Sequence, residues 1–248
     1  MKIFASDIDG TLFFGDHTPS ISNQDIDAIR RFQEQGHLFG VCTGRPLQGV
    51  LAMDYDIHYD FLITCNGAAI FDGEANPLWI KAMDFSTMKE VYEAYHEEST
   101  FTNMKINHAL YTLEKEFPWP ALVVHRINAL DELKQETILG LSFLFQTEEK
   151  AHAVSQAINQ RFSDVEATQN KAYVDIVPKG CTKGTGLLFV KETVHADEAY
   201  GIGDSYNDHE LLEASDVAFA MAQGEKHLQT PSDYVVSSVN EAIEICLR

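Results

Sequence analysis

The chain has 248 residues, of which 45% are hydrophobic, so it is long enough for one large domain or for a core with an inserted second unit. Its net charge is −20, with 38 acidic and 18 basic residues, which argues against binding to nucleic acid or to an anionic membrane surface. A small anionic substrate stays compatible with this charge, because a bound metal can invert the field of one cleft.

The cysteines and the apolar segments indicate a compartment. The four cysteines are scattered, without the spacing of a zinc site or of a redox pair. No basic leader precedes a long apolar run, and no stretch of about 18 apolar residues occurs. These features predict a cytoplasmic protein with reduced thiols and no membrane span, and they leave its oligomeric state open.

Strand-like and helix-like segments alternate over the first eighty residues. Apolar residues recur at helical spacing between Ser22, a suitable N-cap, and Gly36, a suitable stop, which predicts a helix over 22–35. Short apolar runs predict strands over 2–7, 38–42 and 61–64. This alternation predicts a parallel sheet with right-handed crossovers, whose sites gather beyond the carboxyl ends of the strands.

The pattern then changes and later returns. A hairpin is expected over 68–81, and from 84 to 178 helical and strand-like signals mix, with about four strands and two helices. The strands expected there include 140–145 and 173–177, the helices are 86–98 and 148–162, and 115–137 stays ambiguous. After Pro178 the alternation resumes with helices over 184–194 and 207–214 and strands over 198–202 and 217–220.

The fold class predicted from this order is α/β. A doubly wound parallel sheet would form a core from residues 1–83 and 179–248, and an inserted α+β unit would span residues 84–178.

The stretch Asp7-Ile8-Asp9-Gly10 follows the first apolar strand. Residues two apart in an extended backbone point to the same side, so Asp7 and Asp9 can converge on one ligand. Two close carboxylates resist joint ionisation unless a cation neutralises them, and an all-oxygen site suits Mg²⁺. A solvated turn is the alternative for this motif taken alone.

Three further motifs fall at strand ends or helix starts. Thr43 and Gly44 end the second strand, where a hydroxyl and N–H groups can hold a phosphate oxygen. Lys183 opens the helix that returns to the core, and Asp204 follows the strand over 198–202. Each motif alone is typical of a turn or of a solvated lysine, but their joint placement predicts one site.

These four motifs resemble those of the haloacid dehalogenase superfamily of phosphatases. The phrases are Asp-Ile-Asp-Gly-Thr-Leu, Cys-Thr-Gly-Arg-Pro, Lys-Gly-Cys-Thr-Lys-Gly and Gly-Asp-Ser-Tyr-Asn-Asp. The position of the insert resembles the Cof-like subfamily with a C2B-type cap, in which the core is Rossmannoid. The insert matches in size and placement and not in sequence. A departure at 216–221, where such proteins often have Gly-Val-Ala-Met-Gly, puts the fine substrate geometry in doubt.

The resemblance implies a Mg²⁺-dependent phosphatase that acts through an aspartyl-phosphate. Asp7 would be the nucleophile, and Asp9 would protonate the leaving alcohol and later deprotonate water. The metal would be held by Asp7, Asp204 and the backbone carbonyl of Asp9. Phosphate oxygens would contact Lys183 and Thr43, with Gly44 beside it.

Further residues receive less definite roles. Asn207 and Asp208 would support the metal and phosphate shell, with Asn207 a candidate to bind phosphate and Asp208 behind the ligands, and which of the two contacts substrate or metal stays open. Asn66 and Arg45 lie near the predicted junction of core and insert, where either can contact substrate; for Arg45 a structural ion pair is an equal alternative. Polar and aromatic residues of the insert are candidates for choosing the substrate: His108, Tyr111, His125 and Tyr173.

The expected substrate is a small phosphorylated metabolite, either a sugar phosphate or a phosphorylated cofactor, because a cap restricts access. Two other functions stay open. A phosphomutase would use the same motifs and return the phosphoryl group to a sugar. A receiver-like signalling module also combines acids, Thr and Lys on a doubly wound sheet, although the insert argues against it.

Overall fold

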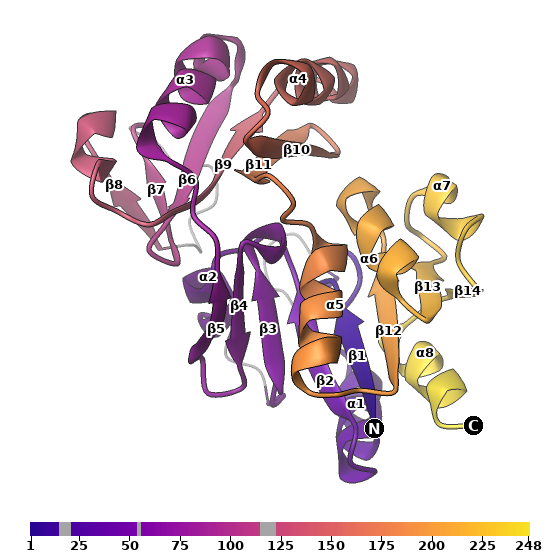
Figure 1. Cartoon of the computed structure of the whole chain (residues 1–248). Helices are drawn as coiled ribbons and strands as arrows, with labels where there is room; N and C mark the ends of the chain where they lie inside the picture. Colours follow the sequence, from indigo (N-terminus) through magenta and orange to yellow (C-terminus); the bar gives the residue numbers. More distant parts are fainter. Residues whose placement is uncertain (15–20, 54–55, 115–122) are drawn as a thin grey trace.

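The computed structural model describes residues 1–14, 21–53, 56–114 and 123–248. Within these residues two β-sheets organise the chain, the larger with eight strands in the order β14-β13-β12-β1-β2-β3-β4-β5 (Figure 1). These strands are β1 (Lys2–Ser6), β2 (Leu38–Cys42), β3 (Phe61–Thr64), β4 (Ala69–Asp72), β5 (Pro77–Ile80), β12 (Glu198–Gly203), β13 (Val217–Met221) and β14 (Tyr234–Val236).

Six neighbouring strands of this sheet, from β14 to β3, are parallel. The hairpin of β4 and β5 continues the sheet in antiparallel pairing. In a parallel sheet the carboxyl ends of all strands lie at one edge, and here β1, β2, β3 and β12 end toward the second sheet (Figure 1).

Helices cover both faces of the larger sheet. Alternate residues of β1 show why: Phe4 packs in a cluster with Ile29 and Ile243, whereas Ile3 packs with Leu187 on the opposite face. The first pair of helices is α1 (Asn23–Glu34) and α8 (Val239–Cys246), and the second pair is α5 (Lys183–Thr193) and α6 (His209–Ala214). The predicted doubly wound α/β fold is therefore confirmed, as is the Ser22 N-cap, whose side chain accepts from the N–H of Asp25.

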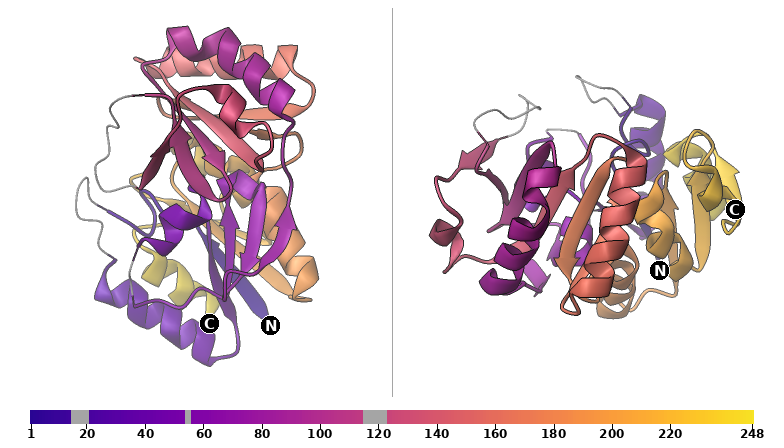
Figure 2. Two further views of the ribbon diagram at one scale, coloured as in Figure 1. Left: turned by 90° about the vertical axis from the view of Figure 1, so that its left-hand side faces the viewer. Right: turned by 90° about the horizontal axis from the view of Figure 1, so that it is seen from above.

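The second sheet has the order β10-β11-β9-β6-β7-β8 among the described residues, and all of its pairings except that of β7 with β8 are antiparallel. Its strands are β6 (Phe101–Ile106), β7 (Ala109–Thr112), β8 (Val124–Arg126), β9 (Ile138–Leu144), β10 (Val165–Asn170) and β11 (Tyr173–Pro178). Helices α3 (Phe85–Tyr95) and α4 (Glu148–Arg161) cover the face turned away from the larger sheet (Figure 2).

Short elements complete the described chain. They are α2 (Leu47–Leu51), α7 (Lys226–Gln229) and four 3₁₀ turns at Cys65–Gly67, His96–Glu98, Leu130–Leu133 and Tyr206–Asp208. No helix of the described residues is both long enough and apolar enough to cross a membrane.

Several predicted elements differ in detail from the structure. The expected helix over 86–98 becomes α3 followed by a 3₁₀ turn, and the expected helix over 207–214 likewise begins with a 3₁₀ turn. The expectation of about four strands between 84 and 178 is wrong, because the described residues of this range form six. Part of the ambiguous segment, 115–122, lies outside the described residues. The boundaries of 84–178 as an independent domain stay a prediction, although this range contains all of the second sheet.

Two connections join the sheets, one after β5 and one after β11. They contact each other, since the Lys81 ammonium donates to the Lys179 carbonyl over 2.7 Å. A second contact joins α2 to the β6–β7 turn, where the N–H of Gln48 donates to the carbonyl of His108 over 3.0 Å. The second sheet is thereby held over the edge at which the four sequence motifs lie.

Candidate active site

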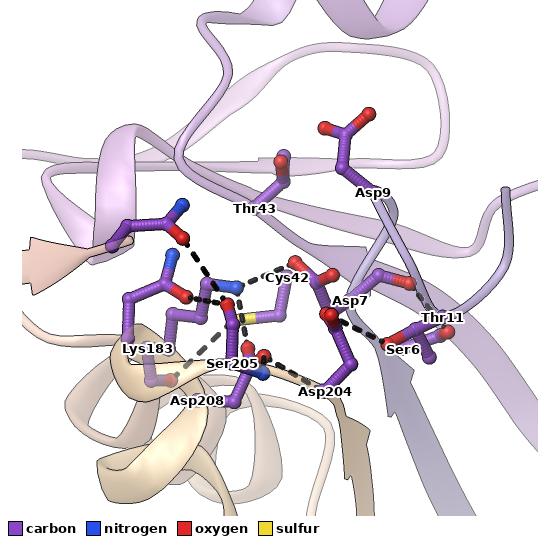
Figure 3. A network of polar contacts seen from close by, with 12 residues as sticks. Ser6, Asp7, Asp9, Thr11, Cys42, Thr43, Lys183, Asp204, Ser205 and Asp208 are labelled. Carbon is purple, nitrogen blue, oxygen red and sulfur yellow. Dashed lines mark hydrogen bonds and ion pairs between the residues drawn. The ribbon is translucent and has the colours of Figure 1, made fainter. Parts of the chain in front are cut away.

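Asp7 lies where the buried strand β1 ends. Its N–H donates to the carbonyl of Ile202 on β12 over 3.0 Å, which extends the parallel pairing by one residue. The side chain is 6% exposed and points to Lys183 and Asp204 (Figure 3). The sheet thus fixes one carboxylate at the junction of β1 and β12.

Lys183 occupies the centre of this cluster. Its ammonium donates to Asp7 Oδ1 over 2.6 Å and to Asp208 Oδ1 over 2.5 Å, and its side chain is fully buried. Burial alone would lower the pKa of Lys183, but the neighbouring Asp208 and Asp7 carboxylates outweigh it and raise that pKa. Lys183 is therefore a fixed cation at the first turn of α5.

Asp204 and Asp208 add two further buried carboxylates. One oxygen from each of Asp7, Asp204 and Asp208 lies within 4.8 Å of the other two. Asp208 is already engaged, because its Oδ1 accepts from Lys183 and its Oδ2 accepts from the N–H groups of Asp204 and Ser205 at 3.0 Å. The Asp204 side chain is less engaged than that of Asp208, because its Oδ1 accepts a long hydrogen bond, of 3.4 Å, from the Thr11 hydroxyl.

Burial and the neighbouring charges disfavour the ionised forms of the Asp7 and Asp204 carboxyl groups. Burial raises the pKa of Asp7 well above its ordinary value, and the charge of Asp208 adds to this effect while Lys183 opposes it. Burial and Asp208 raise the pKa of Asp204 to about 6. A hard cation would stabilise both anions, so the donor set fits a divalent metal.

Gly10 makes room for this arrangement. Its φ is +99°, which L side chains rarely adopt, and a Cβ on it would lie 2.4 Å from Asp204 Oδ2. The glycine of the Asp-x-Asp-Gly motif is therefore required by the close approach of the loop after β1 to the loop after β12.

Asp9 and Arg45 form a separate pair above the buried cluster. Arg45 donates to both Asp9 oxygens, from Nε over 2.7 Å and from Nη2 over 2.6 Å. The Asp9 side chain is 56% exposed and points away from Asp7 (Figure 3). The predicted ion-pair role of Arg45 is thus present, and Arg45 also lines the cavity described below.

Thr43 and Asn66 follow β2 and β3. Thr43 is buried, and its Oγ1 accepts from the N–H of Arg45 over 3.1 Å. Asn66 is 4% exposed with φ +50°, and its amide atoms have no hydrogen-bond partner among the described residues. A Cβ on Gly44 would lie 3.2 Å from Asn66 Oδ1, so the backbone at Gly44 passes close to this amide.

A cavity of about 320 Å³ opens above the cluster, between the two sheets. The loops and the turn that follow β1, β2 and β12 of the larger sheet contribute Asp7, Asp9, Thr43, Gly44, Arg45, Pro46, Ser205 and Asn207. The second sheet and its turns contribute Asn103, Lys105, Leu110, Ser142, Asn170, Tyr173 and Asp175. A hydrogen bond of 3.3 Å from Ser205 Oγ to Asn170 Oδ1 joins the two walls.

Four residues of the insert were predicted as candidates for choosing the substrate, and few of them line the cavity. Tyr173 lines the cavity, whereas His108, Tyr111 and His125 are not among its lining residues. His125 stacks on Tyr111, with ring centroids 4.8 Å apart, and His108 packs edge-on against Phe71. The sequence analysis missed the lining residues Asn103, Lys105, Ser142 and Asp175. Nothing in their residue types marks them, and only the pairing of the strands shows that they share one face of the sheet.

Comparison with known proteins identifies the family. A family model described as haloacid dehalogenase-like hydrolase matches residues 4–243, so the chain belongs to the haloacid dehalogenase-like hydrolases. It is 25% identical to a Bacillus subtilis 5-amino-6-(5-phospho-D-ribitylamino)uracil phosphatase, over 97% of this chain and 94% of that protein. It is 24% identical to a second phosphatase of Bacillus subtilis, over 97% and 96%.

Solved structures agree with the fold. A haloacid dehalogenase-like hydrolase from Bacillus subtilis superposes with a TM-score of 0.87 at 20% sequence identity, covering 98% of this chain and 96% of that chain. The likeness covers nearly the whole chain and so shows the fold over both sheets. The family match bears out the resemblance that the motifs indicated.

Proposed function

We propose that the protein is a Mg²⁺-dependent phosphatase that hydrolyses a small phosphate monoester through a phosphorylated Asp7. The observation that carries the proposal is the buried cluster of Asp7, Lys183 and Asp204 beneath a cavity of about 320 Å³. The family is one of hydrolases, and relatives of similar length are named phosphatases. A cavity of this size suits a small metabolite better than a protein segment.

Asp7 and Asp204 would hold the metal through their side chains, with the backbone carbonyl of Asp9 as a third protein ligand. Asp208 is a poorer ligand candidate, since both of its oxygens already accept hydrogen bonds. It would instead orient Lys183 and the loop that carries Asp204. Bound Mg²⁺ would offset the negative charge of the phosphoryl oxygens and so allow a carboxylate to approach them.

In the first step Asp7 attacks phosphorus, so that a bond forms between a carboxylate oxygen and phosphorus while the bond from phosphorus to the leaving oxygen breaks. Asp9 gives a proton to the leaving alkoxide, which departs as an alcohol. Arg45 has to release Asp9 before Asp9 can carry that proton, and a phosphate entering beside Thr43 offers Arg45 another anion.

In the second step Asp9 takes a proton from water, and the water oxygen attacks phosphorus. The bond between phosphorus and Asp7 breaks, which restores the Asp7 carboxylate and releases inorganic phosphate. Lys183 keeps Asp7 in place through both steps and offsets the negative charge that accumulates near it. Thr43 and Asn207, which line the cavity, would contact phosphate oxygens.

A screen of phosphate esters with Mg²⁺ tests the proposal. We expect release of inorganic phosphate that stops in a chelator and returns with Mg²⁺. Transfer of the phosphoryl group to a second hydroxyl of the product, without phosphate release, would identify a mutase instead. A stable phospho-form without turnover would identify a receiver-like module.

Gly10→Ala should raise the Mg²⁺ requirement. The new Cβ would lie 2.4 Å from Asp204 Oδ2, so the carboxylate has to move. We expect about tenfold weaker Mg²⁺ activation, the size typical for disturbing the support of a metal ligand. Gly36→Ala is the matched control, because its φ of +79° carries a similar backbone cost of about 1–2 kcal/mol while nothing lies within 4 Å of the new Cβ. Equal Mg²⁺ activation in the two variants would contradict the assigned role of Asp204.

Mg²⁺ affinity should fall as the pH falls through about 6, the pKa of metal-free Asp204. Metal binding has to displace any proton from this ligand, so the affinity should drop about tenfold per pH unit for each proton displaced.

The folding stability of the protein without metal should change with pH in the opposite direction. Protonation of Asp204 stabilises the folded chain fully below the ordinary value of 3.8 and this contribution is lost as the pH rises through about 6. Thermal shift by Mg²⁺ at several pH values measures both, and a constant affinity from pH about 7 to about 5 would exclude these ligands.

A further inference from the structure

A buried amide of the larger sheet lies at the border between the two sheets. Asn66, in the turn after β3, is 4% exposed, yet neither its Oδ1 nor its Nδ2 has a hydrogen-bond partner among the described residues. Buried amides of folded proteins are nearly always hydrogen-bonded, because an unpaired one loses its hydration without return. The side chain of Asn66 therefore has a use that this arrangement of the two sheets does not fulfil.

The backbone of this turn is strained and firmly held. The angle φ is +50° at both Cys65 and Asn66 and +88° at Gly67, a run that L residues rarely adopt. The N–H of Cys65 donates to the Arg45 carbonyl over 2.9 Å, and the N–H of Asn66 donates to the Thr43 carbonyl over 3.0 Å. Both bonds tie the turn to the loop after β2, so the amide has a fixed position on the larger sheet.

The six-stranded sheet offers an acceptor and a donor at the same border. Lys105 on β6 donates to Ser142 Oγ on β9 over 3.0 Å and to Asp175 Oδ1 on β11 over 2.8 Å. Ser142 also donates to Asp175 Oδ1. These bonds leave Asp175 Oδ2 as an acceptor, and they leave the third N–H group of the Lys105 ammonium as a donor.

Gly44 shows how near these groups are to one another. A Cβ on Gly44 would lie 3.2 Å from Asn66 Oδ1 and 3.4 Å from Asp175 Oδ2, so both atoms border the same small space. Burial alone would raise the pKa of Asp175, yet Lys105 and other neighbours, Asn66 among them, outweigh it and lower that pKa. Burial raises the pKa of Cys65 to about 12 and the charge of Lys105 opposes this effect, so the ammonium lies near the same turn.

Contact with the other sheet accounts for Asn66 better than contact with a bound molecule. Gly44, Lys105 and Asp175 line the cavity between the sheets, whereas Asn66 is not among its lining residues. An amide that is closed off from the cavity is poorly placed to bind a ligand there. It is well placed to bind side chains of the second sheet, because these border the same space.

We propose that Asn66 is a clasp that holds the six-stranded sheet over the larger sheet. When the sheets come together, Asn66 Nδ2 donates to Asp175 Oδ2, and Asn66 Oδ1 accepts from the Lys105 ammonium. Each of these bonds has one charged partner, which makes it stronger than a bond between neutral groups. The inference goes beyond the proposed function, because this contact needs neither a substrate nor Mg²⁺.

The distance between the sheets in the ligand-free protein tests the clasp. The four native cysteines are buried, so Glu34→Cys on α1 and Glu90→Cys on α3 supply two exposed positions for a donor dye and an acceptor dye. Helices α1 and α3 lie at opposite ends of the molecule (Figure 1), so separation of the sheets changes the energy transfer between the dyes. Single-molecule measurements then give the ratio of open to closed molecules.

Asn66→Asp should open the sheets. The substitution keeps the size of the side chain and suits a positive φ, but it sets a second carboxylate against Asp175. We expect the ratio of open to closed molecules to rise at least about tenfold, the loss typical of a hydrogen bond to a charged group. The exchanged pair, Asn66→Asp with Asp175→Asn, again has one amide and one carboxylate. Its ratio should return to within about threefold of that of the unmodified protein. An unchanged ratio in Asn66→Asp, or no recovery in the exchanged pair, would overturn the inference.

Gly44→Ala tests the same contact without changing either partner. Gly44 is not in the left-handed region, so alanine fits its backbone, but the new Cβ would occupy the space between Asn66 and Asp175. Gly49→Ala is the matched control, since the nearest atom that its Cβ would meet is 3.6 Å away, an ordinary contact. We expect the ratio to rise at least about threefold in Gly44→Ala alone. Equal ratios in the two variants would overturn the clasp, and this comparison decides if thermal unfolding shows that the charged variants do not fold.

Two other uses of the amide give different results. The clasp predicts that Asn66→Gly, which suits the φ of +50° and removes the amide, also opens the ligand-free protein. If Asn66 contacts a bound ester, its variants would change the ratio only when an ester is present. If an ordered water pairs the amide, Asn66→Gly would lower the thermal stability and leave the ratio unchanged. Either result would overturn the clasp and leave the proposed phosphatase function standing, because phosphate release with Mg²⁺ tests that function separately.

Discussion

Asp7→Asn should remove turnover and leave the fold intact. An amide cannot form the phosphorylated intermediate, so kcat should fall by at least about three orders of magnitude, equal to about 4 kcal/mol of activation free energy. The fold should tolerate the change because burial and Asp208 already disfavour the Asp7 anion, and Lys183 keeps its contact with Asp208 at 2.5 Å. Steady-state kinetics and thermal unfolding measure the two parts, and more than about a tenth of the original kcat would exclude Asp7 as nucleophile.

Asp9→Asn is the informative partner of that variant. With p-nitrophenyl phosphate the leaving group needs no proton, so Asp7 can still be phosphorylated, whereas the water of the second step loses its base. The phosphorylated chain should therefore accumulate in Asp9→Asn and not in Asp7→Asn. Mass spectrometry after acid quench would show the added phosphoryl group on the peptide that contains residue 7. Finding it on another residue in either variant would move the nucleophile elsewhere.

The position of the candidate site at the carboxyl edge of the larger sheet could be predicted from the sequence, because a simple rule relates strand ends to that edge. Asp7, Thr43 and Asp204 each follow a short apolar run, and the carboxyl ends of parallel strands meet at one edge. No knowledge of side-chain packing is needed for that step. The structure brings these residues around one cluster, although their catalytic roles stay a proposal.

The cavity wall from the second sheet could not be predicted in the same way. Lys105 and Asp175 look like ordinary strand residues, and only the pairing of β6, β9 and β11 places them on one face. A slip of one residue in the register would turn each side chain to the other face. The aromatic and imidazole residues of this unit were predicted by residue type alone. Residue type does not show which way a side chain points, and His125 and Tyr111 stack on each other outside the lining.

The C-terminal segment shows a signal that was present and not used. Val239, Ala242, Ile243 and Cys246 recur at helical spacing and are the buried residues of α8. The strand β6, by contrast, is buried at all six positions and has no alternation from which to predict it. Helix α8 could therefore have been predicted from its sequence pattern, whereas the sequence of β6 holds no pattern from which to predict a strand.

Lys183→Met should destabilise the metal-free protein strongly. The substitution leaves Asp7, Asp204 and Asp208 buried together without their cation, and breaking a buried pair in this way costs about 3–5 kcal/mol. Lys191→Met is the matched control. Lys191 lies on the same helix α5 and contacts Asp216 at the same 2.6 Å, but the two side chains are 26% and 41% exposed. An exposed pair of this kind contributes about 0–1 kcal/mol.

The pH and metal dependence of Lys183→Met distinguish loss of a cation from loss of packing. Without the ammonium, the pKa values of the remaining carboxyl groups should rise further, so the metal-free variant should regain stability as the pH falls and these groups take up protons. Mg²⁺ should restore part of the stability at neutral pH, since it supplies positive charge to the same oxygens, but it should not restore turnover, because Asp7 is no longer held. Denaturant unfolding of both variants, with and without Mg²⁺ at two pH values, measures these effects. Equal losses in Lys183→Met and Lys191→Met, independent of pH, would show that the buried ammonium does not balance the carboxylate cluster.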